Sequence, residues 1–173
     1  YDRYPRTLDA DLQAAGDLGV DVAFVPDVQT MYPAEQEIPV PPLPDVATEP
    51  RLEDAHRPHH FAGVCQVMAR LLDLVKPSVA VFGEKDYQQL LVIQAMVQPQ
   101  ADRWPGLRIE SHPTVREPDG LAMSSRNVHL SEEERRAASV LYHALRGAKR
   151  LWEGGQHDGE MLRGAVRRVL EKE

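Results

Sequence analysis

The sequence predicts an α/β fold built on a parallel sheet. Residues 79–82 form an uninterrupted apolar run, which is typical of a parallel strand that is buried on both faces. Residues 61–75 and 87–97 carry apolar side chains at intervals of three and four, which is typical of helices that pack on a sheet. Helix, strand and helix therefore alternate, as they do in α/β proteins.

Three further elements are expected before this alternation. Residues 7–18 show a capped helical pattern with one apolar face, which ends at Gly19. Residues 20–26 are rich in β-branched and aromatic side chains and predict a strand. Residues 27–58 are rich in proline and show no period, so we expect a long loop. Such a loop is either a lid or binding segment, or a disordered linker.

After the alternation, the pattern changes to a smaller set of elements. Residues 107–109 predict a weak strand, and residues 115–123 predict a hairpin that turns at Pro118, Asp119 and Gly120. Ser131 and Glu134 predict a capping box that begins one long helix. A second helix follows. The apolar positions of the two helices are Leu141, Leu145, Leu151, Leu162, Val166, Val169 and Leu170. We expect a first domain over residues 1–113 and a second over residues 114–173.

Composition excludes several classes of protein. A formal net charge of -7 argues against non-specific binding to nucleic acid, which needs a surplus of Lys and Arg. No apolar run is long enough to span a bilayer, and the single Cys65 has no partner for a disulfide, so we expect a cytoplasmic protein. The chain begins without methionine and stops directly after an amphipathic pattern, so we also expect a fragment.

The first candidate site follows the strand at residues 79–82. Gly83, Lys85 and Asp86 stand where this strand ends and a helix begins, the place where α/β sheets bind ligands. Lys85 would neutralise a phosphate, and Asp86 would accept hydrogen bonds from sugar hydroxyls. The alternative is that Asp86 is only a helix cap and Lys85 only a solvated charge.

The second candidate site is the polar segment Met123-Ser124-Ser125-Arg126-Asn127. Two hydroxyls, a guanidinium and an amide within four positions suit a polyphosphate, because they satisfy several oxygens at once. The alternative is a polar interdomain loop with Asn127 in a turn.

A metal site is not expected at His59 and His60. Adjacent side chains on a helix point apart, and no His or carboxylate follows at ligand spacing. These residues are better explained as the start of a helix.

Five motifs occur in one order along the chain. They are Tyr4-Pro5-Arg6-Thr7, Met31-Tyr32-Pro33, His60-Phe61-Ala62-Gly63-Val64, Gly83-Glu84-Lys85-Asp86-Tyr87-Gln88-Gln89 and Met123-Ser124-Ser125-Arg126-Asn127. In this order they resemble the pantothenate synthetase family, and the resemblance covers essentially the whole chain.

The resemblance implies a Rossmann-like catalytic domain, a smaller α+β lid domain and a homodimer. It also implies a two-step reaction with MgATP, in which the carboxylate of pantoate forms pantoyl adenylate and pyrophosphate, and the amine of β-alanine then displaces AMP. The small molecules pantoate, β-alanine and ATP are the implied partners, with no nucleic acid and no membrane.

The resemblance also implies roles for twelve residues. The catalytic phosphate ligands of ATP are Lys85, Ser124, Ser125 and Arg126. The ribose contacts are Gly83 and Asp86, and the neighbours of adenine are Val115 and Met123. The pantoate-binding residues are Gln89, Tyr4, His60 and Arg57.

The sequence departs from the family pattern at both ends. The first strand and the His-x-Gly-His segment that precede Tyr4 in the family are absent from the 173 residues, and so is the far end of the second domain. We therefore expect little or no ligase activity from this chain alone. Two alternatives are a nucleotidyltransferase that acts on a phosphorylated acceptor and a non-catalytic fragment. Gln89, beside Lys85 and Asp86, favours a small carboxylic acid over the former.

Overall fold

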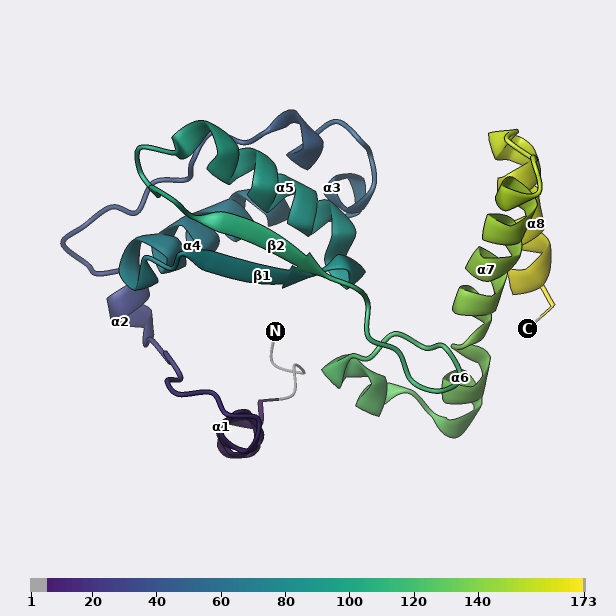
Figure 1. The fold of residues 1–173 in the computed structure, drawn as a ribbon, viewed down its shortest axis with the longest axis horizontal. Helices are drawn as coiled ribbons and strands as arrows, with labels where there is room; N and C mark the ends of the chain where they lie inside the picture. The colour runs from purple at the N-terminus through teal and green to yellow at the C-terminus, as the bar shows by residue number, and fades with distance from the viewer. Residues whose placement is uncertain (1–5, 173) are drawn as a thin grey trace. The chain divides into compact units, whose positions relative to one another are not determined.

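The structure, a computed structural model, describes residues 6–172 (Figure 1). Tyr4 lies outside the described residues, so its predicted role has no structural account. The chain divides into two compact units, Asp9–Pro113 and Thr114–Glu173, the latter together with the first eight residues. The fold is α/β, as predicted.

The first unit is built on two parallel strands, β1 (Val79–Gly83) and β2 (Arg108–His112), in a register that pairs Val79 with Arg108 and Gly83 with His112. Helix α4 (His60–Val75) precedes β1, and α5 (Tyr87–Val97) follows it through the 3-10 turn η2 (Glu84–Asp86). A second 3-10 turn, η3 (Gln98–Gln100), follows α5. The parallel strand predicted at residues 79–82 is therefore confirmed, and both strands end at the same edge of the sheet (Figure 1).

The core of the first unit lies between α4, α5 and one face of the sheet. Its buried residues are Ala47, Phe61, Cys65, Ala69, Leu72, Val92, Ile93, Met96, Val97 and Trp104. Ala80, Phe82 and Ile109 pack against this cluster from the strands. The predicted burial of β1 on both faces is wrong, because Val81, which points to the other face, is 62% exposed. Side chains alternate across a strand, and the described helices cover only the face of Ala80 and Phe82.

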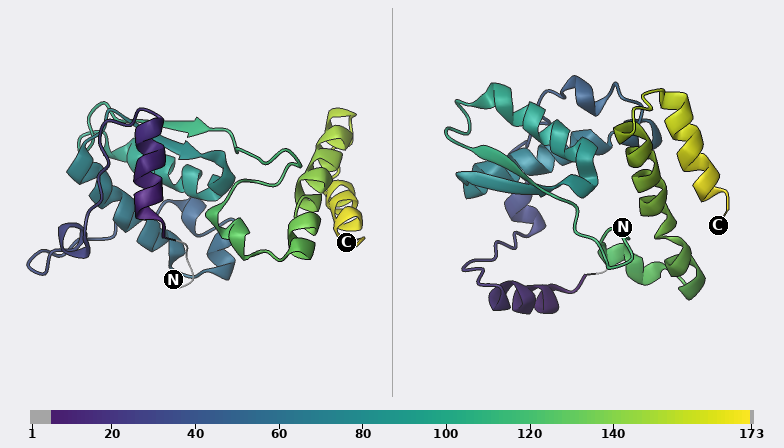
Figure 2. Two further views of the ribbon diagram at one scale, coloured as in Figure 1. Left: turned by 90° about the horizontal axis from the view of Figure 1, so that it is seen from below. Right: turned by 45° about the vertical axis from the view of Figure 1, so that its right-hand side comes forward.

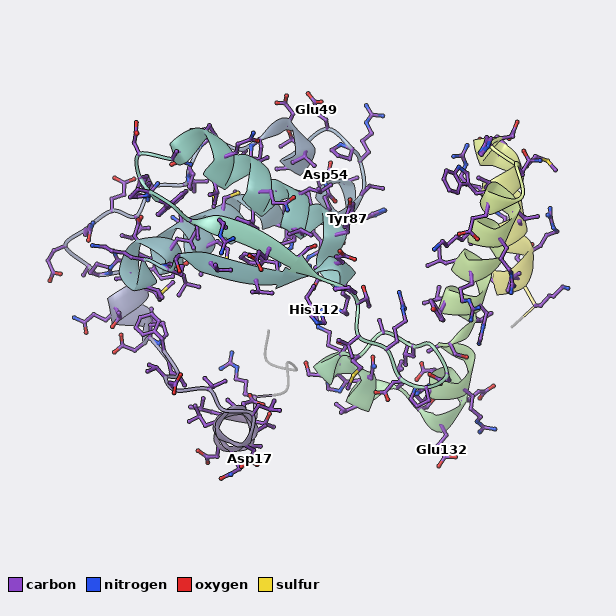
Figure 3. The ribbon with its side chains drawn as sticks, viewed as in Figure 1. Asp17, Glu49, Asp54, Tyr87, His112 and Glu132 are labelled. Carbon is purple, nitrogen blue, oxygen red and sulfur yellow. The ribbon has the colours of Figure 1, made fainter. Side chains whose placement is uncertain are left out.

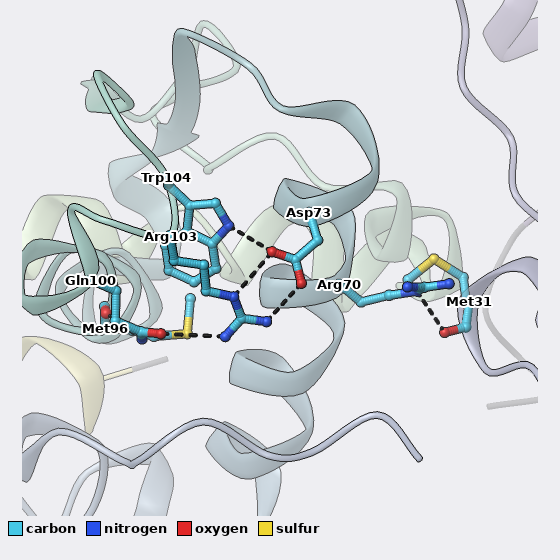
Figure 4. A network of polar contacts seen from close by, with 7 residues as sticks. All are labelled: Met31, Arg70, Asp73, Met96, Gln100, Arg103 and Trp104. Atoms are coloured by element: carbon cyan, nitrogen blue, oxygen red, sulfur yellow. Dashed lines mark hydrogen bonds and ion pairs between the residues drawn. The ribbon is translucent and has the colours of Figure 1, made fainter. Parts of the chain in front are cut away.

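A polar network closes one end of this core (Figure 4). Asp73 of α4 accepts hydrogen bonds from Arg103 Nε at 3.1 Å and from Trp104 Nε1 at 2.9 Å. The guanidinium of Arg103 also lies over the Trp104 ring, 4.7 Å from its centroid. The segment after α5 is thus tied to α4.

The N-terminal elements differ from expectation. The predicted helix is present as α1 (Leu8–Asp17), but none of its residues is buried. Residues 20–26 form no strand, and Val22 is 80% exposed. A strand is defined by hydrogen bonds to a partner, and no other segment within residues 6–172 pairs with these residues.

The proline-rich segment at residues 27–58 is mostly irregular, as predicted, with short turns α2 (Val28–Met31), η1 (Asp45–Ala47) and α3 (Glu53–His56). It is attached to α4, because Arg70 donates to the carbonyls of Met31 at 3.2 Å and Thr30 at 2.8 Å. These contacts contradict the disordered-linker alternative.

The second unit begins with the predicted hairpin, in which Arg116 and Ala122 form an antiparallel bridge. A 3-10 turn, η4 (Ser125–His129), leads to α6 (Glu132–Ala137), and the predicted capping box of Ser131 and Glu134 is present.

The predicted single long helix is wrong. It is divided into α6 and α7 (Val140–Glu153), followed by α8 (Gly159–Leu170). Ser139 stands at the break and donates its hydroxyl to the carbonyl of Arg136 at 3.3 Å, a local bond that competes with helix continuation. Helices α7 and α8 lie side by side (Figures 1 and 2). Within residues 6–172, no helix has both the length and the apolar character that crossing a membrane requires.

Candidate functional site

The first candidate site lies at the carboxyl edge of the sheet. Gly83 is the last residue of β1, and Lys85 and Asp86 lie in η2 directly before α5. Figure 3 labels Asp54, Tyr87 and His112, which lie toward the end of the first unit where both strands end. The predicted strand-to-helix setting of Lys85 and Asp86 is therefore present.

The side chains of Lys85 and Asp86 in this turn are exposed to solvent. Lys85 and Asp86 are 40% and 65% exposed, and Lys85 Nζ lies 3.8 Å from Asp86 Oδ1. Asp86 occupies the cap position of α5, but its carboxylate accepts no capping hydrogen bond. The interpretation of Asp86 as only a helix cap is thus not supported. Gly83 has a φ of -76°, and no atom would crowd a side chain there, so the described structure does not itself require glycine.

A contact that the sequence did not predict joins the two strand ends. Ser111 Oγ, near the end of β2, donates to Glu84 Oε1 at 3.0 Å. Because Glu84 precedes Lys85, this bond fixes the turn against β2. The edge of the sheet that carries the first candidate site is thus held by both strands.

A cavity of about 180 Å³ lies between the proline-rich segment and the start of α4. Two of the predicted pantoate residues, Arg57 and His60, line it, together with the carboxylate-bearing Asp54. Arg57 is held by an ion pair with Glu53 at 2.8 Å. The remaining lining residues are Leu43, Ala47, Thr48, His59, Phe61 and Ala62.

The pKa of His60 is affected by its burial and by the charges around it. Burial lowers its pKa, the charge of Arg57 lowers it further, and the carboxylates of Glu53 and Asp86 oppose these effects without cancelling them. The net pKa lies below the ordinary value, so the imidazole is neutral near pH 7.

Gln89, the remaining predicted pantoate residue, is half-buried in the first turns of α5. It does not line the cavity that contains Arg57 and His60. The structure therefore brings Arg57 and His60 together and leaves Gln89 outside this cavity.

The second candidate site is in the second unit, on the hairpin. Val115 and Met123, the predicted neighbours of adenine, are paired across it, because Met123 N donates to Val115 O at 3.0 Å. Their side chains are 54% and 50% exposed. Ser124 follows directly and caps η4, with its hydroxyl accepting from Arg126 N at 3.3 Å.

Asn127 fits the alternative interpretation of this segment. Its Nδ2 donates to the carbonyl of Ala122 at 3.1 Å, and its N–H donates to that of Ser124 at 3.0 Å. The Asn127 side chain therefore stabilises the turn. Ser125 and Arg126, at the start of η4, are exposed.

His59 and His60, for which no metal site is expected, lie at the start of a helix. Helix α4 begins at His60, as predicted, and His59 precedes it with a left-handed φ of 66°. The described residues contain no group of three His, Cys, Asp or Glu side chains placed to hold a metal ion.

The model of the family described as pantoate-beta-alanine ligase matches residues 1–173. The chain belongs to this family. Pantothenate synthetase from Thioalkalivibrio sulfidiphilus is 48% identical over 172 residues, which are 97% of this chain and 57% of that protein.

Solved structures of the ligase family agree with this assignment. The crystal structure of pantothenate synthetase from Thermus thermophilus has a TM-score of 0.89 at 44% identity, over 98% of this chain and 59% of that one. The pantoate-beta-alanine ligase from Francisella tularensis, solved with "Beta-gamma ATP and Beta-alanine", has a TM-score of 0.77 at 33% identity, over 98% of this chain and 60% of that one. The chain thus spans less than two thirds of the length of these relatives.

Proposed function

We propose that this chain supplies part of an ATP-dependent ligase that condenses pantoate with β-alanine through pantoyl adenylate, releasing AMP and pyrophosphate. The observation that carries the proposal is the exposed Lys85 and Asp86 at the carboxyl edge of a parallel sheet, in a chain of the pantoate-beta-alanine ligase family.

The proposed ligands of the ATP phosphates are Lys85, Ser124, Ser125 and Arg126. Attack of a carboxylate on the α-phosphate places negative charge on that phosphate and on the leaving pyrophosphate. Fixed cations and donors stabilise this charge, and loss of one such donor typically costs about 3 to 4 kcal/mol of transition-state stabilisation. No covalent intermediate with the protein is needed.

The nucleotide base and sugar would be held by residues with matching surfaces. Val115 and Met123 offer a paired apolar edge for adenine. The carboxylate of Asp86 accepts no capping hydrogen bond from α5, and it would accept hydrogen bonds from ribose hydroxyls. Gly83 would allow close approach of the sugar. Mg²⁺ would enter with ATP as part of the substrate, since it is usually held by phosphates and only one or two carboxylates.

Pantoate would bind at the other side of the turn. Arg57 offers a cation for its carboxylate, and the neutral His60 offers a hydrogen-bonding ring in a partly apolar cavity. Gln89, which lies outside this cavity in the described structure, would contribute an amide from the first turns of α5. Holding the acid and the phosphate aligned accounts for most of the catalysis expected from such a site.

The same resemblance leads us to propose that the second unit acts as a lid, that the protein is a cytoplasmic homodimer, and that the 173-residue chain alone has little ligase activity. Binding, rather than turnover, is therefore the decisive test of the proposed function on this chain.

The experiment is an NMR titration of the ¹⁵N-labelled chain with MgATP and, separately, with pantoate. We expect MgATP to shift the amide signals of residues 83–86 and 123–126. Lys85→Ala should weaken MgATP binding at least tenfold, whereas Lys149→Ala, which removes an exposed lysine ion-paired to Glu153, should not. Binding of neither ligand would favour the non-catalytic alternative. Binding of MgATP and a phosphorylated acceptor, but not pantoate, would favour the nucleotidyltransferase.

A further inference from the structure

Gln88, which precedes Gln89 in the first turn of α5, makes three hydrogen bonds to residues far away in the sequence. Its Nε2 donates to the carbonyl of Val46 at 3.0 Å and to Asp54 Oδ1 at 2.9 Å. Its Oε1 accepts from the backbone N–H of Glu53 at 3.0 Å. Both amide hydrogens and the amide oxygen are thus used, and all three partners lie in the proline-rich segment.

Asp54 extends this network into the backbone of the same segment. Its Oδ1 accepts from Leu52 N at 2.9 Å, and its Oδ2 accepts from Arg51 N at 3.1 Å. Arg51 has a left-handed φ of 55°, a conformation that a residue other than glycine adopts only when its surroundings hold it. The Gln88 amide and the Asp54 carboxylate therefore determine the path of the chain into α3.

This path sets one wall of the cavity described above. Asp54 itself lines the cavity, and Glu53, whose N–H bonds to Gln88, holds Arg57 by the ion pair. The apolar contacts of the segment near this path are few: Ala47 is its one buried member of the core cluster in the described chain, and Val46 packs against that cluster. Met31, the other buried apolar residue of the segment, lies far from Asp54 in sequence.

We propose that Gln88 is a positioning residue, which fixes the Arg57 wall of the cavity against the start of α5 and so sets the affinity for the carboxylic acid substrate. The assignment of that substrate as pantoate rests on the proposed function. Only an amide fits this place, because its partners are one donor, one carbonyl and one carboxylate. A carboxylate would keep one acceptor, lose both donors and face the charge of Asp54.

The test compares Gln88→Glu, Gln88→Leu and, as a matched control, Gln94→Leu on the same helix. In the ¹⁵N-labelled full chain, we expect Gln88→Glu and Gln88→Leu to remove the hydrogen-exchange protection of the Glu53 amide. We expect them to weaken pantoate binding about tenfold at pH 7.5, and to leave MgATP affinity and the protection of residues 90–97 within twofold of the wild type. Gln94→Leu should change none of these.

A pH series separates positioning from general destabilisation. In Gln88→Glu, protonation of the introduced carboxyl restores a donor toward Asp54, so pantoate affinity should recover by at least threefold between pH 7.5 and 5.5 relative to the wild type at each pH. Gln88→Leu should not recover. Equal losses for pantoate and MgATP, or unchanged Glu53 protection, would overturn the proposal. Failure of the wild-type chain to bind pantoate would instead overturn the proposed function, and the exchange data would still decide whether Gln88 fixes the segment.

Discussion

In the first unit, residues 83–86 lie at the end of a strand whose inner side chains pack on a buried apolar cluster. In the second unit, residues 123–126 follow a hairpin held mainly by contacts at the surface. Within the described chain, Ala144 is the one buried apolar residue of the second unit. The hairpin is held to its own helices by the ion pair of Arg135 with Asp119 and by the guanidinium of Arg116, 4.2 Å from the centroid of the Tyr142 ring.

This difference teaches that the two candidate sites differ in their tolerance to substitution. Truncation of side chains should damage the first unit through its core, whereas the second unit should be sensitive at a few single contacts. The two tryptophans provide one probe in each unit, Trp104 in the first and Trp152 on α7. Incorporation of 5-fluorotryptophan gives one ¹⁹F signal from each, so the unfolding of each unit can be followed separately.

The largest effect should come from the core of the first unit. Ile93 is fully buried, and we expect Ile93→Ala to lower the free energy of unfolding of this unit by about 2 to 5 kcal/mol, because the mutation leaves a cavity. The control is Leu145→Ala on α7, where the side chain is 57% exposed and the change should stay within about 0.5 kcal/mol. Urea unfolding followed at the Trp104 and Trp152 signals measures both. Equal losses in the two units would contradict the comparison.

In the second unit, the sensitive point is Gly120 in the hairpin turn. It has a φ of +96°, and a Cβ built there would lie 2.1 Å from Cδ1 of Tyr142. We expect Gly120→Ala to destabilise this unit by about 2 to 4 kcal/mol, since both backbone strain and overpacking oppose it.

A second substitution separates these two causes. Tyr142→Ala, combined with Gly120→Ala, removes the clash and leaves the strain, so the two losses should be strongly non-additive. Gly147→Ala on α7 is the control: nothing lies near its Cβ, and it should stabilise by about 0.5 to 1 kcal/mol. An additive pair would show that the ring does not determine the cost.

Much of the fold could be predicted because its signals are local. The apolar spacing of α4 and α5, the turn residues of the hairpin and the Ser131 capping box each act within a few positions. The same local logic placed Lys85 and Asp86 between strand and helix.

The rest depended on contacts between distant residues. Residues 20–26 have the composition of a strand, but composition does not supply a pairing partner. The exposure of Val81 depends on which face the helices cover. Gln88 bonds to residues 34 to 42 positions away, which no local pattern reports. The break at Ser139 was missed because the helix was extended from the capping box at Ser131 to the apolar positions that begin at Leu141, and no proline or glycine stands between them.

Asp73 should make the stability of the first unit depend on pH in the acid range. Burial opposes ionisation, but the hydrogen bonds from Arg103 and Trp104 and the charge of Arg103 outweigh it, so the pKa is lowered. A lowered pKa in the folded state means that the stabilisation is present above the unfolded-state pKa and is lost as the pH falls through the folded-state value.

We therefore expect Asp73→Asn to cost the first unit about 1.5 kcal/mol at pH 7. The variant should also show a flatter dependence of stability on pH below about pH 4, where the unfolded aspartate titrates. Asp119→Asn is the counterpart in the second unit, where the bond from Arg135 lowers the pKa of a carboxyl whose side chain is 41% exposed. Its effect at pH 7 should be smaller. If the free energy of unfolding of Asp73→Asn fell as steeply with acid as that of the wild type, the Asp73 carboxylate would not be the source of the pH dependence.

The smallest effect should come from the ends of two helices. Helix α4 ends at Lys76, which has a left-handed φ of 51°, while α7 is followed by Gly155 with a φ of +97°. A lysine thus adopts the left-handed backbone conformation at a helix end in the first unit, whereas a glycine adopts it in the second. Lys76→Gly should therefore stabilise the first unit by about 0.5 kcal/mol, because the relieved strain slightly exceeds the added entropy of the unfolded chain. Gly155→Lys should destabilise the second by about 1 kcal/mol. Both values can be read from the midpoints of the two ¹⁹F transitions. Since Lys76 is at the opposite end of α4 from His60, an altered pantoate affinity in Lys76→Gly would mean that the helix transmits strain along its length to the cavity.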